Sequence, residues 1–365
     1  MGRHHILPRM AEVTWLVGSG TLAGLLLASC ATSLGGGTAL QKVSVALIST
    51  QHLSEIPKPV ALAVGLGSVW VMAPSPEPGS GTPAYGSLLQ VSERNGALQA
   101  RARVGGAPMS VLPDRHVVWV ANTASSASLH LAYQDSILGL AVPGLSRITV
   151  YSGQALATAP GENPLAADAS GVWAITGAGS DTNVTTLGTT PHVLASVPGI
   201  GSAIAACGPR LYVATTSDSQ TAVREILSST GAITRTWTIP GSALASLRCT
   251  SSGVLLGLSS PTDGGFYELR RGSAGVPRRF GARTQFGVTI VDGNVWTVTA
   301  DQAPSGRWGV WLFGYSLSTY KQVNVPMRLG SGSRLGPIAP EGLAGTAHTL
   351  WAAVGSSLLK IAIGG

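Results

Sequence analysis

Histidines and acidic residues are the side chains that acid–base or metal chemistry would use in this chain. Beyond residue 30 the 365-residue sequence has five histidines, which are His52, His116, His130, His192 and His348. They form no HExxH pattern, and the sequence has no GxSxG, GxxxxGKS, GxxxxGKT or CxxC stretch. The spacing of these residues therefore predicts no standard metalloprotease, serine hydrolase, phosphate-loop or zinc-knuckle site.

The elements that would position a site form a repeat. An aliphatic residue precedes a large anchor residue at seven places, which are Val69-Trp70, Val118-Trp119, Val172-Trp173, Leu211-Tyr212, Val254-Leu255, Val295-Trp296 and Leu350-Trp351. Eight positions before each anchor stands a branched aliphatic residue: Leu62, Val111, Leu165, Ile204, Leu247, Val288 or Leu343. The residue before that is small or Pro, and turn-forming residues lie between the two segments. The anchors are 39 to 55 residues apart, which is typical of propeller blades.

Each repeat predicts a buried strand, a tight turn and a second strand that carries the anchor, followed by further strands. Only 11% of the residues are charged and 48 are Gly, a composition that favours short strands and turns over charged helices. We expect an all-β chain that forms a seven-bladed β-propeller with four-stranded antiparallel blades. The last repeat is one strand short, so residues 42–50 are expected to join the last blade and close the ring.

The unit P-x-small-aliphatic, turn, Val-Trp-Val-Ala resembles the repeats of YVTN-type, NHL-type and streptogramin-lyase-like (virginiamycin B lyase-like) propellers over about residues 42–363. Such propellers include lyases, sensors, scaffolds and quinone enzymes, so the resemblance implies the fold more firmly than an activity. It also implies that a lyase would use histidines and an acid with a divalent metal late in the propeller. No histidine lies between His192 and His348, so the resemblance assigns no catalytic residue to this sequence.

Two of the histidines occupy equivalent places in the repeat. His116 and His348 each stand three residues before their anchor, where other repeats have Gly, Ser or Pro. Histidine tolerates the left-handed backbone of a turn better than most residues. We expect both to be turn residues rather than a metal pair, because they belong to the second and seventh blades.

The N-terminal sequence predicts export. Residues 1–29 have a basic start and an apolar middle, as in a signal peptide, and Leu27-Ala28-Ser29-Cys30 resembles a bacterial lipobox. Lipidation of Cys30 would anchor the mature chain outside the cytoplasm through residues 30–41, a tether of small residues. The alternatives are an ordinary signal peptide and an uncleaved anchor. Residues 42–365 are expected to be one propeller domain, which is predicted to be a monomer.

The two remaining cysteines occupy nearly equivalent places in adjacent repeats. Cys207 lies five residues before its anchor, and Cys249 lies six residues before the next one. An oxidising compartment would allow a disulfide between neighbouring inner strands. The alternative is two buried free thiols, a common structural role for cysteine.

Basic residues gather in one segment. Residues 268–283, ELRRGSAGVPRRFGAR, contain five arginines at the expected outer edge of blade five, and the chain has a net charge of +7. A solvated edge strand protected by charge is one interpretation. The other is docking onto an anionic cell-envelope polymer or an acidic envelope protein. Nucleic acid is not expected, because the chain is predicted to be exported and this segment lacks interleaved aromatics.

Polar residues in the loops before the inner strands would converge at the mouth of the channel. This channel-mouth group is Lys58, Glu162, Asn163, Gln285 and Glu341. Convergent polar groups at a concave surface predict a ligand-binding site, although solvated loops would look the same in sequence. The long segment 122–145 on the same face is expected to be a loop with a short helix that covers the channel or docks a partner.

These observations together predict a lipid-anchored binding or scaffold protein of the cell envelope, a receptor or adaptor, without a cofactor. The alternative is a metal-dependent lyase or hydrolase of the streptogramin-lyase-like class, using Glu162, Glu341 and a divalent metal. A degenerate, inactive member of that class would show the same missing histidines.

Overall fold

The computed structural model describes most of the region beyond residue 42. The described ranges are residues 43–53, 59–73, 86–105, 108–122, 137–151, 163–178, 180–217, 220–240, 244–259, 264–273, 277–281, 286–335 and 340–364. Within them every regular element is a β-strand, so the all-β prediction is confirmed. No helix in this part of the chain is available to cross a membrane.

The described strands form seven antiparallel sheets of four strands, one sheet for each predicted blade. Blade one has β2 (Ala61–Gly65), β3 (Ser68–Ala73), β4 (Gly86–Ser92) and β5 (Leu98–Val104). Blade two has β6 (Pro108–Asp114), β7 (Val117–Asn122), β8 (Ile137–Ala141) and β9 (Ser146–Tyr151). Blade three has β10 (Leu165–Asp168), β11 (Gly171–Ala178), β12 (Asp181–Leu187) and β13 (His192–Pro198). The order of the strands in each sheet follows the sequence.

The second half of the ring repeats this arrangement. Blade four has β14 (Ile200–Ala206), β15 (Arg210–Thr216), β16 (Gln220–Leu227) and β17 (Ile233–Pro240). Blade five has β18 (Leu244–Cys249), β19 (Gly253–Ser259), β20 (Gly265–Arg270) and β21 (Arg278–Phe280). Blade six has β22 (Phe286–Val291), β23 (Asn294–Gln302), β24 (Trp308–Ser316) and β25 (Met327–Gly332). Blade seven has β26 (Pro340–Thr346), β27 (Thr349–Val354), β28 (Ser357–Gly364) and, as its outer strand, β1 (Ser44–His52).

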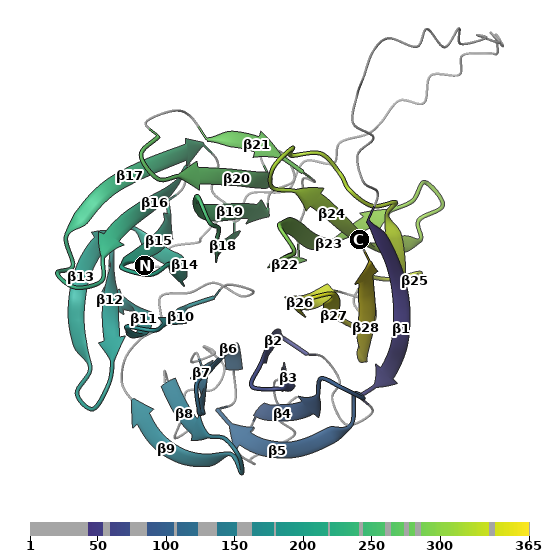
Figure 1. Ribbon diagram of the computed structural model, residues 1–365, viewed down its shortest axis with the longest axis horizontal. Helices are drawn as coiled ribbons and strands as arrows, with labels where there is room; N and C mark the ends of the chain where they lie inside the picture. Colours follow the sequence, from purple (N-terminus) through teal and green to yellow (C-terminus); the bar gives the residue numbers. More distant parts are fainter. Residues whose placement is uncertain are drawn as a thin grey trace, which may run out of the picture. The chain divides into compact units, whose positions relative to one another are not determined.

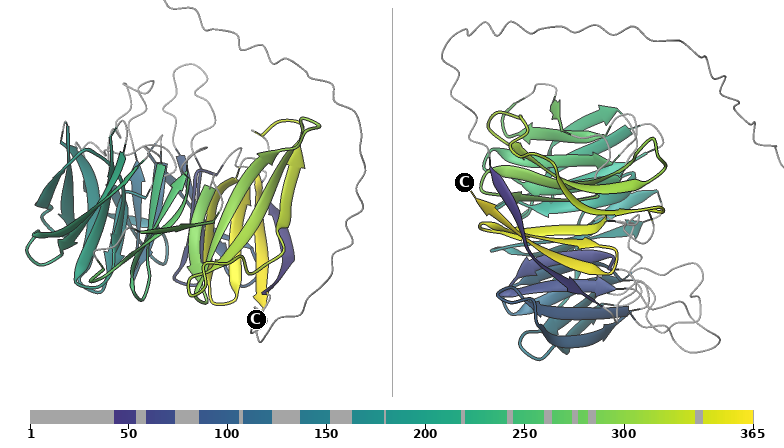
Figure 2. Two further views of the ribbon diagram at one scale, coloured as in Figure 1. Left: turned by 90° about the horizontal axis from the view of Figure 1, so that it is seen from above. Right: turned by 90° about the vertical axis from the view of Figure 1, so that its right-hand side faces the viewer.

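The first strand of each blade lies innermost, and the seven inner strands surround a central opening (Figure 1). Neighbouring inner strands contact one another all the way round the ring, from β2 and β6 to β26 and back to β2. Figure 2 shows the blades from the side, standing next to one another as twisted sheets. The predicted seven-bladed β-propeller is therefore confirmed.

The ring is closed by pairing of the first and last strands. Strand β1 runs antiparallel to β28, from Ser44 opposite Gly364 to His52 opposite Ser357. The closing strand predicted over residues 42–50 is thus present, shifted by two residues. Because β1 lies outside β28, it pairs the backbone edge that β28 would otherwise expose.

The anchors of the repeat fill the spaces between the blades. Trp70, Trp296, Trp351 and Tyr212 are among the largest side chains that are fully buried. Small residues upstream of the anchors allow neighbouring inner strands to approach closely. A Cβ added at Gly342 would lie 2.9 Å from the Cβ of Leu62 in the next blade, and one at Gly287 would lie 2.7 Å from the backbone nitrogen of Leu343. The small residues therefore follow from inter-blade packing.

One prediction is wrong in part. The predicted loop and short helix within residues 122–145 includes Ile137–Ala141, which form β8 and pair with β7. Ile137, Leu138 and Leu140 are buried, so packing within the four-stranded blade determines the conformation of this segment. Residues 123–136 lie outside the described residues.

The two turn histidines differ in their backbones. His348 has a positive φ of 65°, as expected for its turn position. In the equivalent turn of blade two the left-handed residue is Arg115, with a φ of 53°, and not His116. The prediction of a turn holds at both places, while the residue that takes the strained conformation shifts by one in blade two.

Candidate binding site

Most of the channel-mouth group lies outside the described residues, as does Cys30. This applies to Lys58, Glu162 and Gln285, and for Glu341 the structure describes only the backbone, in β26. The side chain of Asn163 is described, and its Oδ1 accepts a hydrogen bond of 2.7 Å from Ser110 Oγ in blade two. Its backbone oxygen accepts from the amide of Ile204 in blade four. Asn163 thus connects three blades, and the convergence of the whole group stays a prediction.

The cysteines form the disulfide that their repeat positions suggested. Cys207 directly follows β14 and Cys249 ends β18, the inner strands of blades four and five. Their Cα atoms are 5.5 Å apart. The bond therefore connects adjacent blades close to the central opening.

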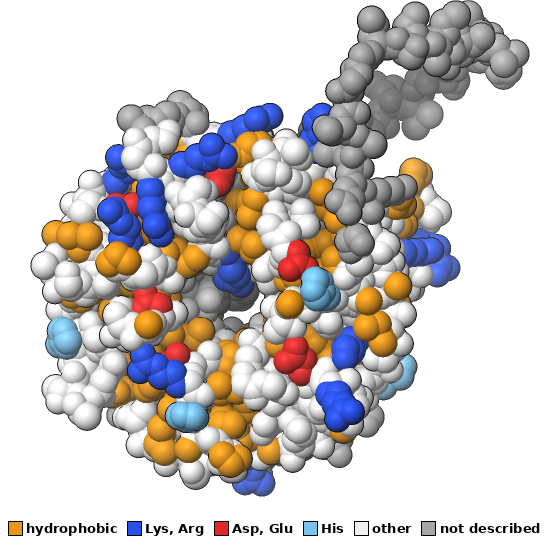
Figure 3. Space-filling model, viewed as in Figure 1, with side chains coloured by type: hydrophobic (Ala, Val, Ile, Leu, Met, Phe, Trp, Pro, Cys, Tyr) orange, Lys and Arg blue, Asp and Glu red, His pale blue; other side chains and the backbone are white. Residues whose placement is uncertain are grey.

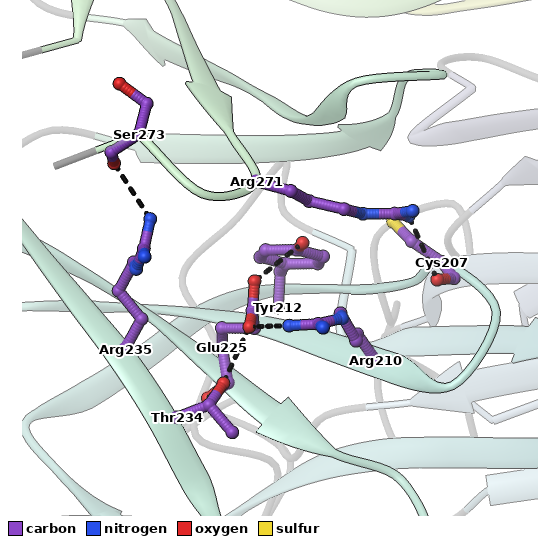
Figure 4. A network of polar contacts seen from close by, with 8 residues as sticks. All are labelled: Cys207, Arg210, Tyr212, Glu225, Thr234, Arg235, Arg271 and Ser273. Carbon is purple, nitrogen blue, oxygen red and sulfur yellow. Dashed lines mark hydrogen bonds and ion pairs between the residues drawn. The ribbon is translucent and has the colours of Figure 1, made fainter. Parts of the chain in front are cut away.

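A buried carboxylate lies at the centre of a network of polar contacts in blade four (Figure 4). Glu225 in β16 accepts hydrogen bonds from Tyr212 at 3.0 Å and Thr234 at 2.6 Å, and it pairs with Arg210. Its side chain is only 4% exposed. Burial alone would raise the pKa of Glu225, but the hydrogen bonds from Thr234 and Tyr212 and the charge of Arg210 lower it. Glu225 is therefore ionised at neutral pH, and each of its contacts stabilises that charge.

Two arginines extend this network toward blade five. Arg235 donates to the backbone oxygen of Ser273 at 2.8 Å and lies over the ring of Trp237, 5.4 Å from its centroid. Arg271 of blade five reaches back to the backbone oxygen of Cys207 at 3.4 Å. Figure 4 shows Arg210, Arg235 and Arg271 around the buried Tyr212–Glu225 pair. Contacts between blades therefore hold Arg235 and Arg271 in place, whereas Arg210 is held within blade four.

A second buried carboxylate repeats the pattern between blades five and six. Glu268 in β20 accepts from Ser252, from Tyr320 of blade six and from Arg270 Nε at 2.9 Å. Burial would raise the pKa of Glu268, but the hydrogen bonds from Ser252 and Tyr320 and the contact with Arg270 lower it. Arg278 in β21 lies over the ring of Tyr320, 4.7 Å from its centroid. Aromatic and carboxylate groups therefore hold these arginines as well.

Together these contacts define a basic surface over blades four and five. We call it the arginine face; it consists of Arg210, Arg235, Arg270, Arg271 and Arg278. Figure 3 shows Lys and Arg side chains gathered over this part of the ring. Its five arginines stand against two buried carboxylates, Glu225 and Glu268, which leaves an excess of positive charge at the surface.

Sequence reasoning found only part of the arginine face. The segment 268–283 supplies Arg270, Arg271 and Arg278, whereas Arg279 instead donates to the backbone oxygen of Gly264. Arg210 and Arg235 were missed because they come from blade four. One signal was available: Glu225 and Glu268 both lie opposite an anchor on the neighbouring strand, as their pairing with Tyr212 and Leu255 shows.

The described residues contain no cluster of three His, Cys, Asp or Glu that could hold a metal ion. The nearest approach is a pair: His348 Nδ1 lies 3.0 Å from Asp292 Oδ2, across the boundary between blades seven and six. The His348 side chain is 75% exposed. Its contact is with a carboxylate, and His116 does not join it in any described contact.

Comparison with known proteins bears on the fold. No protein-family model matches the chain, and no curated protein sequence matches it. Among solved structures, the chain is similar to a chain in "Crystal Structure of Mitotic Checkpoint Complex", with a TM-score of 0.57 and 11% identity. The alignment covers 94% of this chain and 99% of that one. At this identity the likeness shows the propeller fold alone.

Proposed function

We propose that the chain is an exported, lipid-anchored propeller that binds an anionic polymer of the cell envelope through its arginine face. It acts as a scaffold, receptor or adaptor and not as an enzyme. The observation that carries the proposal is the arginine face itself, in which inter-blade contacts hold cationic groups at one surface. A propeller is compatible with such a role, because its blades present a broad rigid surface.

The arrangement suits a polyanion for three physical reasons. Guanidinium groups bind carboxylates and phosphates through parallel N–H donors, so they recognise repeated acidic groups. The two carboxylates beneath the arginine face, Glu225 and Glu268, are buried and already accept hydrogen bonds from neighbouring side chains. They therefore compete little with a ligand for the exposed N–H groups of the arginines. The contacts of Arg235 with Ser273 and of Arg278 with Tyr320 restrict these side chains before binding. Binding therefore costs less conformational entropy than it would with mobile side chains.

The proposed location rests on the N-terminal sequence and on the disulfide. The lipobox-like stretch ending at Cys30 supports export and anchoring. A disulfide between Cys207 and Cys249 is consistent with an oxidising compartment outside the cytoplasm. The Val-Trp anchors in the second strands support the further proposal that the repeats are of the YVTN, NHL and streptogramin-lyase-like type.

The proposal is tested with two soluble polymers of different acidic groups, polyphosphate and alginate. Binding of fluorescent polymer to the full-length protein is measured by anisotropy as a function of salt. The double variant Arg235→Gln/Arg278→Gln removes two cations whose side chains pair with no carboxylate of the described residues. The control Arg307→Gln/Arg334→Gln removes the same charge from exposed positions in blade six.

We expect the test variant to bind about tenfold more weakly, since tenfold corresponds to ~1.4 kcal/mol and two exposed contacts supply about that amount. The control is expected to bind like wild type. Equal loss in both variants would reduce the effect to net charge and contradict the proposed site. Cross-linking in native membranes that captures an acidic protein through the arginine face would replace the polymer by a protein partner.

A further inference from the structure

One cation outside the arginine face lies on a strand that borders the central opening. Arg248, in β18, is the only basic residue of the seven inner strands. Figure 1 shows β18 among the inner strands that surround the opening. Arg248 is half-buried, so part of the side chain remains accessible to solvent.

The guanidinium of Arg248 is held by two backbone oxygens. Its Nε donates to Val288 O in blade six at 2.9 Å, and its Nη1 donates to Leu247 O at 2.8 Å. A guanidinium has five N–H donors, so these two bonds leave three for another acceptor. Among the described residues no carboxylate pairs with Arg248. The group is thus fixed in orientation, while most of its donors have no acceptor in the part of the chain that the structure describes.

Packing between blades does not explain the choice of arginine. The residue that follows the branched aliphatic of the first strand is Ala63, Leu112, Ala166, Ala205, Thr289 or Ala344 in the other six blades. At this position six of the seven inner strands therefore have no cation. At the junction of blades five and six, by contrast, the Arg248 side chain reaches the next inner strand.

The electrostatics of Arg248 also favour binding of an anion. Burial lowers the pKa of Arg248, because the protein around it replaces water that would solvate the charge. The group still stays charged, since arginine keeps its proton throughout the range in which proteins are stable. A half-buried cation with no anionic partner among the described residues is costly, and an anion that enters the opening would relieve that cost.

We propose that Arg248 is the anchoring residue of a ligand site in the central opening, which takes one oxyanionic group of a small molecule. The group is a carboxylate or a phosphate, since both match the parallel N–H donors of a guanidinium. The backbone oxygens of Val288 and Leu247 orient the guanidinium group. The site is separate from the arginine face, so either proposal can fail while the other stands.

The first test measures thermal stability of the full-length protein in detergent during titration with inorganic phosphate or with acetate. Chloride is exchanged so that ionic strength stays constant. We expect at least one anion to raise the Tm of wild type by about 1–3 °C with saturation. Which anion does so distinguishes a phosphate from a carboxylate ligand. Arg248→Gln should lose the saturable shift, whereas Arg307→Gln and Arg235→Gln/Arg278→Gln should keep it.

Absence of a saturable shift in wild type, or an equal shift in Arg248→Gln, would overturn the proposal. A second measurement uses only wild type, in case Arg248→Gln does not fold. Phenylglyoxal labels arginines, and the rate at each site is read by peptide mass spectrometry. Saturating phosphate or acetate should slow labelling of Arg248 at least about fivefold and leave Arg307 unchanged. Equal rates at Arg248 with and without both anions would exclude an oxyanion bound there.

Discussion

The hydroxyl of Tyr212 lies 3.0 Å from Oε2 of Glu225, directly across two neighbouring strands of blade four. Tyr212 is an anchor, and five of the other six blades have tryptophan at this place. The residues that lie opposite those tryptophans on the neighbouring strand contact the rings in different ways. Gly314 leaves room for Trp296, since an added Cβ would lie 2.6 Å from that ring, and Lys360 lies over Trp351 at 5.3 Å. In blade four the anchor instead donates a hydrogen bond to a buried charge.

Replacement of Tyr212 by Phe removes one donor to the buried Glu225 and keeps the ring. We expect the free energy of unfolding to fall by about 1–3 kcal/mol, because a buried charged acceptor loses a hydrogen bond. Urea denaturation followed by tryptophan fluorescence measures the change. Thr234→Val should show a loss of the same kind, since Thr234 donates to the other oxygen of Glu225. Unchanged stability in both variants would contradict a structural role for this carboxylate.

Stability should depend on pH through Glu225 and Glu268. The pKa of each carboxyl is lower in the folded protein than its ordinary value of 4.5. The folded state therefore binds the proton less readily than the unfolded state, and the stabilisation is fully present above pH 4.5. It is lost as the pH falls through the folded pKa values. The double variant Glu225→Gln/Glu268→Gln should show a flatter fall in the free energy of unfolding below pH 4.5, and an unchanged slope would contradict this account.

The disulfide should contribute measurably to stability. It closes a chain segment with a sequence separation of 42 residues. The chain-entropy estimate for a loop of that length is about 4 kcal/mol. Reduction with dithiothreitol should therefore lower the midpoint of denaturation, whereas the variant Cys207→Ala/Cys249→Ala should not respond to the reductant. If wild type melts identically with and without dithiothreitol while mass spectrometry shows full reduction, blades four and five are held by packing alone.

The closing strand should protect the ring from association. Deletion of residues 1–52 removes β1 and exposes the backbone edge of β28 along the whole register from Ser44 to His52. We expect a lower Tm and concentration-dependent aggregation in light scattering. Deletion of residues 1–42 keeps β1 and serves as the control. A monomeric shorter chain with an unchanged Tm would show that closure does not depend on this strand.

Lipid anchoring should depend on Cys30. A Cys30→Ser variant expressed in bacteria should move from the membrane fraction to the soluble fraction, because it lacks the thiol to which lipid would be attached. Stable membrane attachment needs two or more acyl chains. Immunoblots of fractionated cells give the measurement, and Cys207→Ser/Cys249→Ser is the matched control. Equal membrane association of Cys30→Ser and wild type would favour an uncleaved anchor.

The fold could be predicted from sequence because propeller packing repeats the same local requirement in every blade. Each anchor needs an aliphatic neighbour, and each inner strand needs a small residue where it meets the next one, as Gly342 and Leu62 show. Strand β8 was missed because the segment before it obscured its boundary, and only the pairing with β7 reveals that Ile137 begins a strand.

The candidate sites depend on relations between blades, which sequence periodicity does not contain. Tyr320 contacts Glu268 although the two residues are far apart in sequence and belong to different blades. The same holds for Arg235 and Ser273. Arg248 could have been noticed as the one charged residue at its repeat position, but its bond to Val288, and the N–H donors that no described residue occupies, follow only from the structure.

The most direct test of the central claim is a hydrogen-exchange footprint of the full-length protein with and without polyphosphate. We predict slower exchange in residues 208–212, 233–237, 270–273 and 277–280, which contain the arginine face, with little change in blades one and seven. Slower exchange confined to other blades, or no change at polymer concentrations that saturate binding, would contradict the claim that this surface is the docking site.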